Sequence, residues 1–302
     1  MGRSDNPDCL LDPATIDAAT DTCNPLRYIP SIALNATGVA LYGTAAAITI
    51  YYQIRYRKLG LWFMVLPISV ACEAIGLALR IWLRTNVHSL GGYIVTNMFV
   101  ILSPCGLLAA DYVLLGRLVR WLNADRYLFI RPEKVSTIFI ISDVVTFLIQ
   151  ATGGGMSAMA SMAKIGPKIF LVGLAAQLGS FILFTFMWLV FLIRARRDTV
   201  VWNHPGWKGL YFALGWTCIF FIVRSCFRVV ELSQGYVGYL ATHEAFVFGL
   251  DTIPLWIGLV VYCWYWPPKI LTAETAIPKV THDYQMNGPD SPGRVHNLDD
   301  KY

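Results

Sequence analysis

The stretch IFFIVRSCFRVVELSQGYVGY runs from Ile219 to Tyr239. Its first half is as apolar as a membrane-spanning helix, yet it carries Arg224, Arg228 and Glu231. A charged side chain inside hydrocarbon costs several kcal/mol, even when it bends towards the interface. The stretch therefore predicts a helix that belongs to a bundle and turns its charged face away from lipid.

The composition of the whole chain is that of a membrane protein. Of its 302 residues, 56% are hydrophobic and 14% are charged, against about 25% charged in ordinary soluble domains. The net charge of +5 is spread over short loops, whereas nucleic-acid-binding proteins gather Lys and Arg on one face. The sequence has no Walker A motif and no Cys/His spacing suited to zinc, so we expect no nucleotide, no nucleic acid and no cofactor.

Seven stretches contain the roughly 20 mostly apolar residues that a helix needs to cross a bilayer. We therefore expect an all-α, polytopic membrane protein with seven transmembrane helices. The expected spans are residues 31–53, 61–83, 93–116, 135–154, 169–193, 209–232 and 242–265. Pro67, Pro104 and Pro254 fall inside three of them and are expected to mark kinks.

The loops predict the orientation of the chain. The loops after the first, third and fifth spans hold twelve Lys and Arg residues, and the loops after the other spans hold three. Because basic loops stay in the cytoplasm, the N-terminus is expected outside and the C-terminus inside. The predicted organisation is an extracellular tail at 1–30, a membrane domain at 31–266 and a disordered cytoplasmic tail at 267–302.

Two features of the first span and the tail before it bear on the outer surface. Cys9 and Cys23 lie in the external tail, where they form either a disulfide or two free thiols. The sequence NAT at Asn35–Thr37 is a glycosylation sequon, but it lies inside the first span and is expected to be unused.

The charged and amide residues of the spans follow a helical pattern. Members of four pairs are seven residues apart, which is two helical turns and places each pair on one helix face. The pairs are Glu73 and Arg80, Asp143 and Gln150, Arg224 and Glu231, and Glu244 and Asp251. Arg228 joins the stripe of the sixth span, and His243 lies at the outer rim of the seventh. With the predicted orientation, most of these groups share the outer half of the bilayer, and Asp111 lies towards the cytoplasm.

Two interpretations of these residues stay open. The charges either clamp helices together by ion pairs or line a site. Six carboxylates in the spans stand against three arginines, which leaves a net charge of −3. A polar cavity that opens to the outer leaflet and receives a cationic group explains this excess better than clamping does.

Several segments of the sequence together resemble one protein family. The segments are YIPSIALN at Tyr28–Asn35, EAIGLALR at Glu73–Arg80, LSPCGLLAADYVLLGRL at Leu102–Leu118, SDVVTFLIQATGGG at Ser142–Gly155, GLAAQLGSFILF at Gly173–Phe184, and RSCFRVVELSQGYVG with HEAFVFGLD between Arg224 and Asp251. In order and spacing they resemble the fungal lipid-translocating exporters of the RTA type over residues 28–271. Leu77, Phe227 and Asp111 depart from the pattern of that family.

The resemblance implies a plasma-membrane protein that exports or flops amphipathic lipids such as sphingoid long-chain bases, or gives resistance to toxic lipids or sterol-like compounds. It implies no enzymatic activity. The expected partners are membrane lipids, as cationic or zwitterionic amphiphiles. The carboxylates are expected to attract an amine, and Arg80, Arg224 and Arg228 would suit a phosphate. The residues expected to bind or pass the substrate are Glu73, Arg80, Asp143, Gln150, Arg224, Arg228, Glu231, His243, Glu244 and Asp251.

Two other function classes compete with transport. Seven spans with basic inner loops are also the layout of a lipid receptor or sensor that signals through its inner loops and tail. An intramembrane hydrolase would need several His ligands for zinc, and only His243 lies near a span. The glycines at Gly153–Gly155 are either a gating hinge or a helix end with close packing. The sequence leaves the lipid, the direction of movement, the energy source and the oligomeric state open.

Overall fold

The computed structural model describes residues 29–86, 88–128, 130–157, 162, 165–234, 240 and 244–271. The described residues form helices and short connections, with no strand among them. Seven helices in this part of the chain are long and apolar enough to cross a membrane, as predicted. The first six spans are α1 (Ile32–Arg55), η3 with α3 (Leu61–Phe63 and Val65–Leu83), α4 (Leu90–Trp121), α5 (Pro132–Ser157), α6 (Gly166–Ala195) and α8 (Trp207–Ser233).

The seventh span is built from several short helical pieces. They are α10 (Glu244–Val247), the π-helical turn η5 (Phe248–Thr252), α11 (Ile253–Val260), η6 (Val261–Cys263) and α12 (Pro267–Ile270). The remaining short helices are α2 (Arg57–Gly60), η4 (Asp125–Tyr127) and α7 (Thr199–Asn203). Most spans extend a few residues beyond the expected limits, because helices continue past the hydrocarbon into charged ends such as Lys168 and Arg194 of α6.

The spans pack in the order of the chain and form a closed ring. α1 packs on α3, α3 on α4, α4 on α5, α5 on α6, α6 on α8 and α8 on α11, and α11 returns to α1. α4 also contacts α8 across the bundle. These two spans are the most enclosed by protein, with 61% of α4 and 56% of α8 buried. Residues on α4 and α8 are thus placed to meet several other helices.

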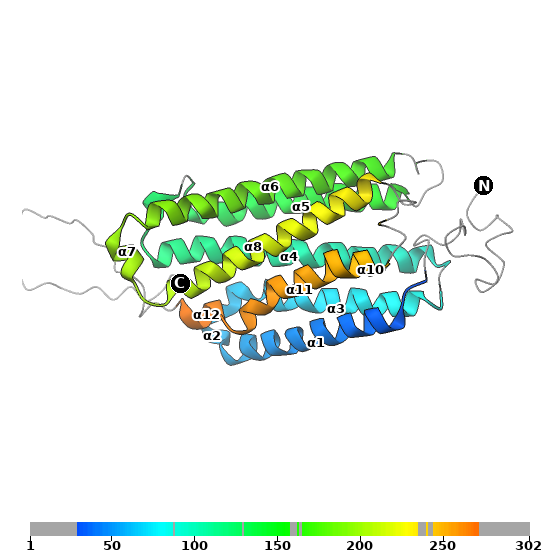
Figure 1. Ribbon diagram of the computed structural model, residues 1–302, viewed down its shortest axis with the longest axis horizontal. Helices are drawn as coiled ribbons and strands as arrows, with labels where there is room; N and C mark the ends of the chain where they lie inside the picture. The colour runs from blue at the N-terminus through cyan, green and yellow to red at the C-terminus, as the bar shows by residue number, and fades with distance from the viewer. Residues whose placement is uncertain are drawn as a thin grey trace, which may run out of the picture.

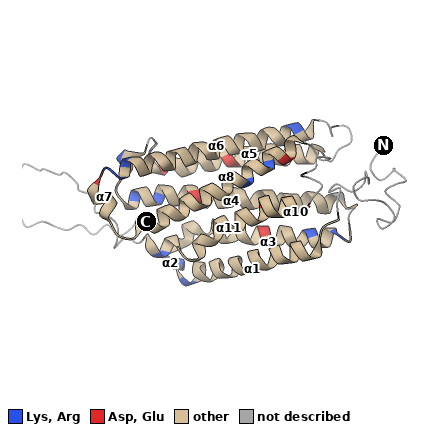
Figure 2. Cartoon of the chain, viewed as in Figure 1, with Lys and Arg blue, Asp and Glu red and all other residues tan. Residues whose placement is uncertain are grey.

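The short connecting helices gather at one end of the bundle. α2, α7 and α12 lie at this end, and the start of α1 lies at the other end with α10 (Figure 1). The basic loops after α1, α4 and α6 therefore share one end, where Figure 2 shows clustered Lys and Arg. The cytoplasmic assignment of this end stays a prediction.

The outer surface of the bundle is apolar. On α5, Ile141, Val145 and Leu148 are each at least half exposed. Asp143 and Gln150 of the same helix are buried. The helix thus has an inverted pattern, apolar outside and polar inside, which is what lipid as the surrounding solvent demands.

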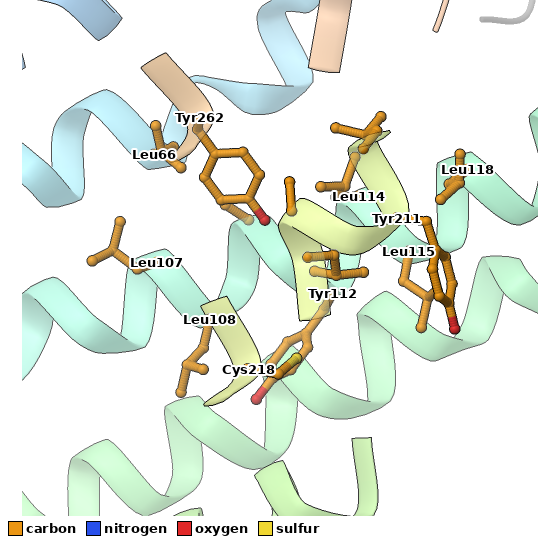
Figure 3. Packing of buried hydrophobic residues seen from close by; sticks show 14 of the residues in the cluster. Leu66, Leu107, Leu108, Tyr112, Leu114, Leu115, Leu118, Tyr211, Cys218 and Tyr262 are labelled. Carbon is orange, nitrogen blue, oxygen red and sulfur yellow. The ribbon is translucent and has the colours of Figure 1, made fainter. Parts of the chain in front are cut away.

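The interior at the α7 end is an apolar cluster rich in aromatic rings (Figure 3). Tyr112 of α4 meets Phe184 of α6 edge-on, with ring centroids 4.6 Å apart. Tyr211 of α8 stacks on Trp188 at 5.0 Å. Such pairs hold the ends of α4, α6 and α8 nearest α7 in a fixed arrangement.

The prolines differ in part from the expected kinks. Pro104 does lie inside α4, but Pro67 lies in the first turn of α3, where no helical partner awaits its missing N–H. Pro254 opens α11 directly after the π-helical turn η5. In the seventh span the proline and the π turn together break the regular hydrogen-bond ladder.

Several predictions concern residues that the structure does not describe. The tail at 1–28 with Cys9 and Cys23, residue His243, and the tail at 272–302 all lie outside the described residues. The proposed disulfide and the disorder of the tails stay predictions.

Gly153, near the end of α5, serves close packing. A Cβ on Gly153 would stand 2.5 Å from the backbone nitrogen of Phe170 and 2.9 Å from the carbonyl oxygen of Gly166, both on α6. Gly155 has nothing within 4 Å of such a Cβ. The helices therefore touch backbone to backbone at Gly153, as small residues allow in membrane proteins.

We predict that Gly153→Ala destabilises the bundle by about 1–3 kcal/mol, because neither backbone atom can yield without moving a helix. The matched control Gly155→Ala should be neutral or stabilising by up to about 1 kcal/mol, the helix propensity of Ala over Gly. Thermal unfolding in detergent measures both. Equal effects of the two substitutions would contradict the packing role of Gly153.

Candidate functional site

The structure places most of the expected site residues inside the bundle. Buried side chains are Glu73, Arg80, Asp143, Gln150, Arg224, Glu231 and Asp251. Arg228 and Glu244 are partly buried, and His243 lies outside the described residues. The residues come from α3, α5, α8 and the seventh span, and they divide into three groups.

The first group is an ion-paired network between α8 and the seventh span. Arg224 Nε lies 2.9 Å from Asp251 Oδ1, at an angle that makes the contact an ion pair rather than a linear hydrogen bond. Arg228 Nη1 contacts Glu231 Oε2 at 2.8 Å within α8, and Arg228 Nε lies 4.0 Å from Asp251 Oδ1. Asp251, on the π-helical turn, thus has two arginines within reach.

Glu73 of α3 faces this network from the other side. Arg224, Asp251 and Arg80 are its charged neighbours. The Ser103 side chain of α4 lies next to the Glu73 carboxylate, but its hydroxyl completes no standard hydrogen bond and Glu73 Oε2 has no partner among the described residues. The buried network therefore draws on α3, α8 and the seventh span, with α4 beside it.

The second group joins the two ends of the chain's membrane domain at the α10 end. Glu244 Oε2 accepts the backbone N–H of Ser31 at 2.7 Å, and Glu244 Oε1 accepts Asn35 Nδ2 at 2.6 Å. Deeper down, the Tyr42 hydroxyl donates to the Thr252 carbonyl at 2.7 Å. These bonds close the ring between α1 and the seventh span. They also bury Asn35, so its amide is not exposed as a glycosylation site would be.

The third group lies between α4, α5 and α6. Gln150 Nε2 donates to Gln177 Oε1 at 2.8 Å, and Gln177 Nε2 donates to Cys105 Sγ at 3.2 Å. Asp143 lies two helical turns before Gln150 and is 3% exposed. It faces Tyr112, yet in the described part of the chain neither of its oxygens accepts a hydrogen bond of standard geometry.

Asp111 forms a separate contact nearer the α7 end. Its Oδ1 accepts the Tyr262 hydroxyl at 2.6 Å, and its Oδ2 accepts the Thr217 hydroxyl at 2.8 Å. Both carboxylate oxygens are therefore used in joining α4, α8 and η6. Figure 3 shows Tyr262 among the leucines of this region.

Sequence reasoning missed several polar partners. Gln177 was the only amide in the quoted segment Gly173–Phe184, and that was the available signal. Tyr42, Ser103 and Tyr112 gave no signal, because a hydroxyl inside an apolar run looks the same whether it packs or donates. Asn35 appeared only as part of a sequon, and its role as a partner of Glu244 depends on a residue 209 positions away.

Among the described residues, no three His, Cys, Asp or Glu side chains are placed to hold a metal ion. What the arrangement offers instead is charge and hydrogen bonding inside an apolar shell. Such groups bind a polar headgroup or carry protons.

The ion pair of Arg224 and Asp251 gives a direct stability test. Arg224→Ala leaves a buried carboxylate without its cation and should cost about 3–5 kcal/mol. The double variant Arg224→Gln with Asp251→Asn removes both charges and keeps polar contact, so most of that loss should be recovered. Thermal unfolding of the three proteins in lipid nanodiscs measures the effects. A double variant as unstable as Arg224→Ala would show that the two residues do not act as a pair.

Comparison with known proteins gives one family and several yeast relatives. Residues 66–274 match the model of the family described as RTA1 like protein. Protein RTA1 of Saccharomyces cerevisiae is 29% identical over 65% of this chain and 63% of its own length. Protoporphyrin uptake protein 1 of the same yeast is 26% identical over 66% and 67%. Sphingoid long-chain base transporter RSB1 is 26% identical over 79% and 72%.

The match covers 63%, less than two thirds, of the length of the first of these relatives. No solved structure gives a significant match to the chain.

Proposed function

The chain belongs to the RTA1-like protein family, and from that premise we propose that it moves amphipathic lipids between the two leaflets of a membrane. Sphingoid long-chain bases are the substrate class that we propose. One relative is named a transporter of these bases, and another is named for uptake of protoporphyrin. The proposal needs no covalent step, no cofactor and no nucleotide, and it places the protein in the plasma membrane with its N-terminus outside.

The observation that carries the proposal is the polar interior inside an apolar shell. Each of the seven spans contributes at least one polar side chain to the buried contacts, from Tyr42 of α1 to Asp251 of the seventh span. Helices in lipid can associate through packing and small residues alone. Ionisable groups buried in spans are costly and mark the paths of substrates or ions. An amphiphile that crosses the bilayer needs such a path for its headgroup, while its chain stays in lipid.

The network around Asp251 has the form of a switch that such movement requires. Asp251 lies 2.9 Å from Arg224 and 4.0 Å from Arg228. Its π-helical turn lies next to Pro254, where the hydrogen-bond ladder is already interrupted. A small shift of the seventh span exchanges one arginine for the other without leaving the carboxylate unpaired. Charge exchange of this kind lets two arrangements have similar free energy.

Reconstitution tests the proposal. Purified protein in liposomes should speed the transfer of a fluorescent long-chain base between leaflets, relative to protein-free vesicles. A pH gradient that alters the rate would indicate proton coupling. Saturable binding without transfer would make the protein a lipid sensor, the second function class. The absence of both binding and transfer would overturn both function classes.

The double variant Arg224→Gln with Asp251→Asn separates function from clamping. It keeps the contact between α8 and the seventh span but has no charges to exchange, so it should fold and lose most of the transfer. Val223→Ala, on the exposed face of α8, is the matched control and should transfer lipid at the wild-type rate. Normal transfer by the folded double variant would assign the pair to helix clamping alone.

A further inference from the structure

We propose that Asp143 is the residue that binds the cationic amine of the substrate, in a subsite between α4, α5 and α6 that is distinct from the arginine network. This inference rests on the proposed function and adds to it a headgroup site with a defined charge preference. It predicts that amphiphiles with a free amine are substrates and that their neutral derivatives are not.

The carboxylates in the spans differ in how they are paired. Four of the carboxylates in the spans are engaged by cations or by hydrogen-bond donors. They are Asp251 with Arg224, Glu231 with Arg228, Glu244 with Ser31 and Asn35, and Asp111 with Tyr262 and Thr217. Glu73 has Arg224 and Arg80 as charged neighbours. Among the described residues, Asp143 is the carboxylate of this set that has neither a Lys or Arg neighbour nor a hydrogen bond of standard geometry.

The polar atoms left unpaired around Asp143 are of one kind. In the described part of the chain, both oxygens of Asp143, Oε1 of Gln150 and the hydroxyl oxygen of Tyr112 are buried without a hydrogen-bond partner. All of these atoms are able to accept. Gln150 already uses its amide nitrogen on Gln177. Only the Tyr112 hydroxyl of this set can also donate, and it lies beside Asp143. Acceptors therefore outnumber donors, which is complementary to an ammonium group with three N–H donors and no acceptor.

The positive charges of the interior lie away from Asp143. Arg80, Arg224 and Arg228 lie on α3 and α8, beside Glu73 and Asp251. Their guanidinium groups repel an amine and attract a phosphate. The subsite at Asp143 has no such arginine in contact with it. A non-phosphorylated long-chain base is therefore directed to α5, and away from the network.

The helices beside Asp143 are open to lipid on their outer faces. α5 and α6 are the least enclosed of the spans, with 28% of each buried. The outer face of α5 carries Ile141, Val145 and Leu148, which lie against lipid on the proposed placement. An alkyl chain can thus remain in hydrocarbon while its amine reaches inward past one helix.

The experiment compares two probes in proteoliposomes. One is a fluorescent long-chain base with a free amine, and the other is its N-acetyl derivative, which has the same chain and no charge. Wild-type protein should accelerate transfer of the free base and should have little effect on the derivative. Asp143→Asn is close to isosteric and should slow transfer of the free base by about tenfold or more, as expected when a charge-assisted contact is lost. Asp143→Glu should keep part of the activity.

Asp111→Asn is the matched control, because it also replaces a buried aspartate of a span, one whose oxygens already hold hydroxyl groups. It should transfer the free base at close to the wild-type rate. Thermal unfolding of each variant confirms that the compared proteins are folded.

Each outcome has a separate meaning. If wild-type protein moves neither probe, the proposed function fails. If wild-type protein moves both probes equally, or Asp143→Asn moves the free base as well as wild type does, the function stands and the amine subsite is wrong. Equal losses in Asp143→Asn and Asp111→Asn also overturn the subsite, because they indicate a structural role for both aspartates. The comparison of probes on wild-type protein holds even if a variant does not fold.

Discussion

The cost of an unpaired charge in hydrocarbon is the constraint on which this structure depends. It turns the polar face of every span inward and leaves branched aliphatic side chains on the outside, as α5 shows with Asp143 inside and Ile141 outside. The ion pair between Arg224 and Asp251 shows this constraint most clearly. It joins two spans by charges that neither helix could keep alone. The rotation of α8 in the bundle follows from that pair.

The two sides of the ring are held by different forces. Between α1 and the seventh span, side-chain hydrogen bonds cross the interface, such as Asn35 to Glu244 and the indole N–H of Trp256 to the Leu41 carbonyl. Between α5 and α6, backbones approach directly at Gly153. Hydrogen bonds can exchange partners at little cost, whereas interlocked backbones move only as a unit. The π-helical turn of the seventh span lies on the exchangeable side, so motion is expected there and a fixed frame at α5 and α6.

The spans and the inward polar faces were predictable from sequence because both depend on helical periodicity alone. A window of about 20 apolar residues gives the span, and a spacing of seven gives the face. The partners were not predictable, because they depend on which helices are neighbours and on their relative depth. Gln150 was expected at the site, but its bond to Gln177 was not. Glu231 was expected to line a site, but its pairing with Arg228 of its own helix was not foreseen. Pro67 was expected to mark a kink, and the second span changes from the 3₁₀ turn η3 to the α-helix α3 shortly before it.

The interior has two chemically different sides, and this difference bears on selectivity. The side formed by α3, α8 and the seventh span contains arginines matched to carboxylates, so it has little net attraction for an amine. The side formed by α4, α5 and α6 contains acceptor atoms and an aspartate that has no cation beside it among the described residues. Under the proposed function, a headgroup is sorted by charge before it moves. Because the acceptor side is also the more rigid one, an amine held there stays in place while the opposite side of the ring rearranges. Binding and motion are then assigned to different helices, and a lipid headgroup need not break an existing ion pair in order to enter.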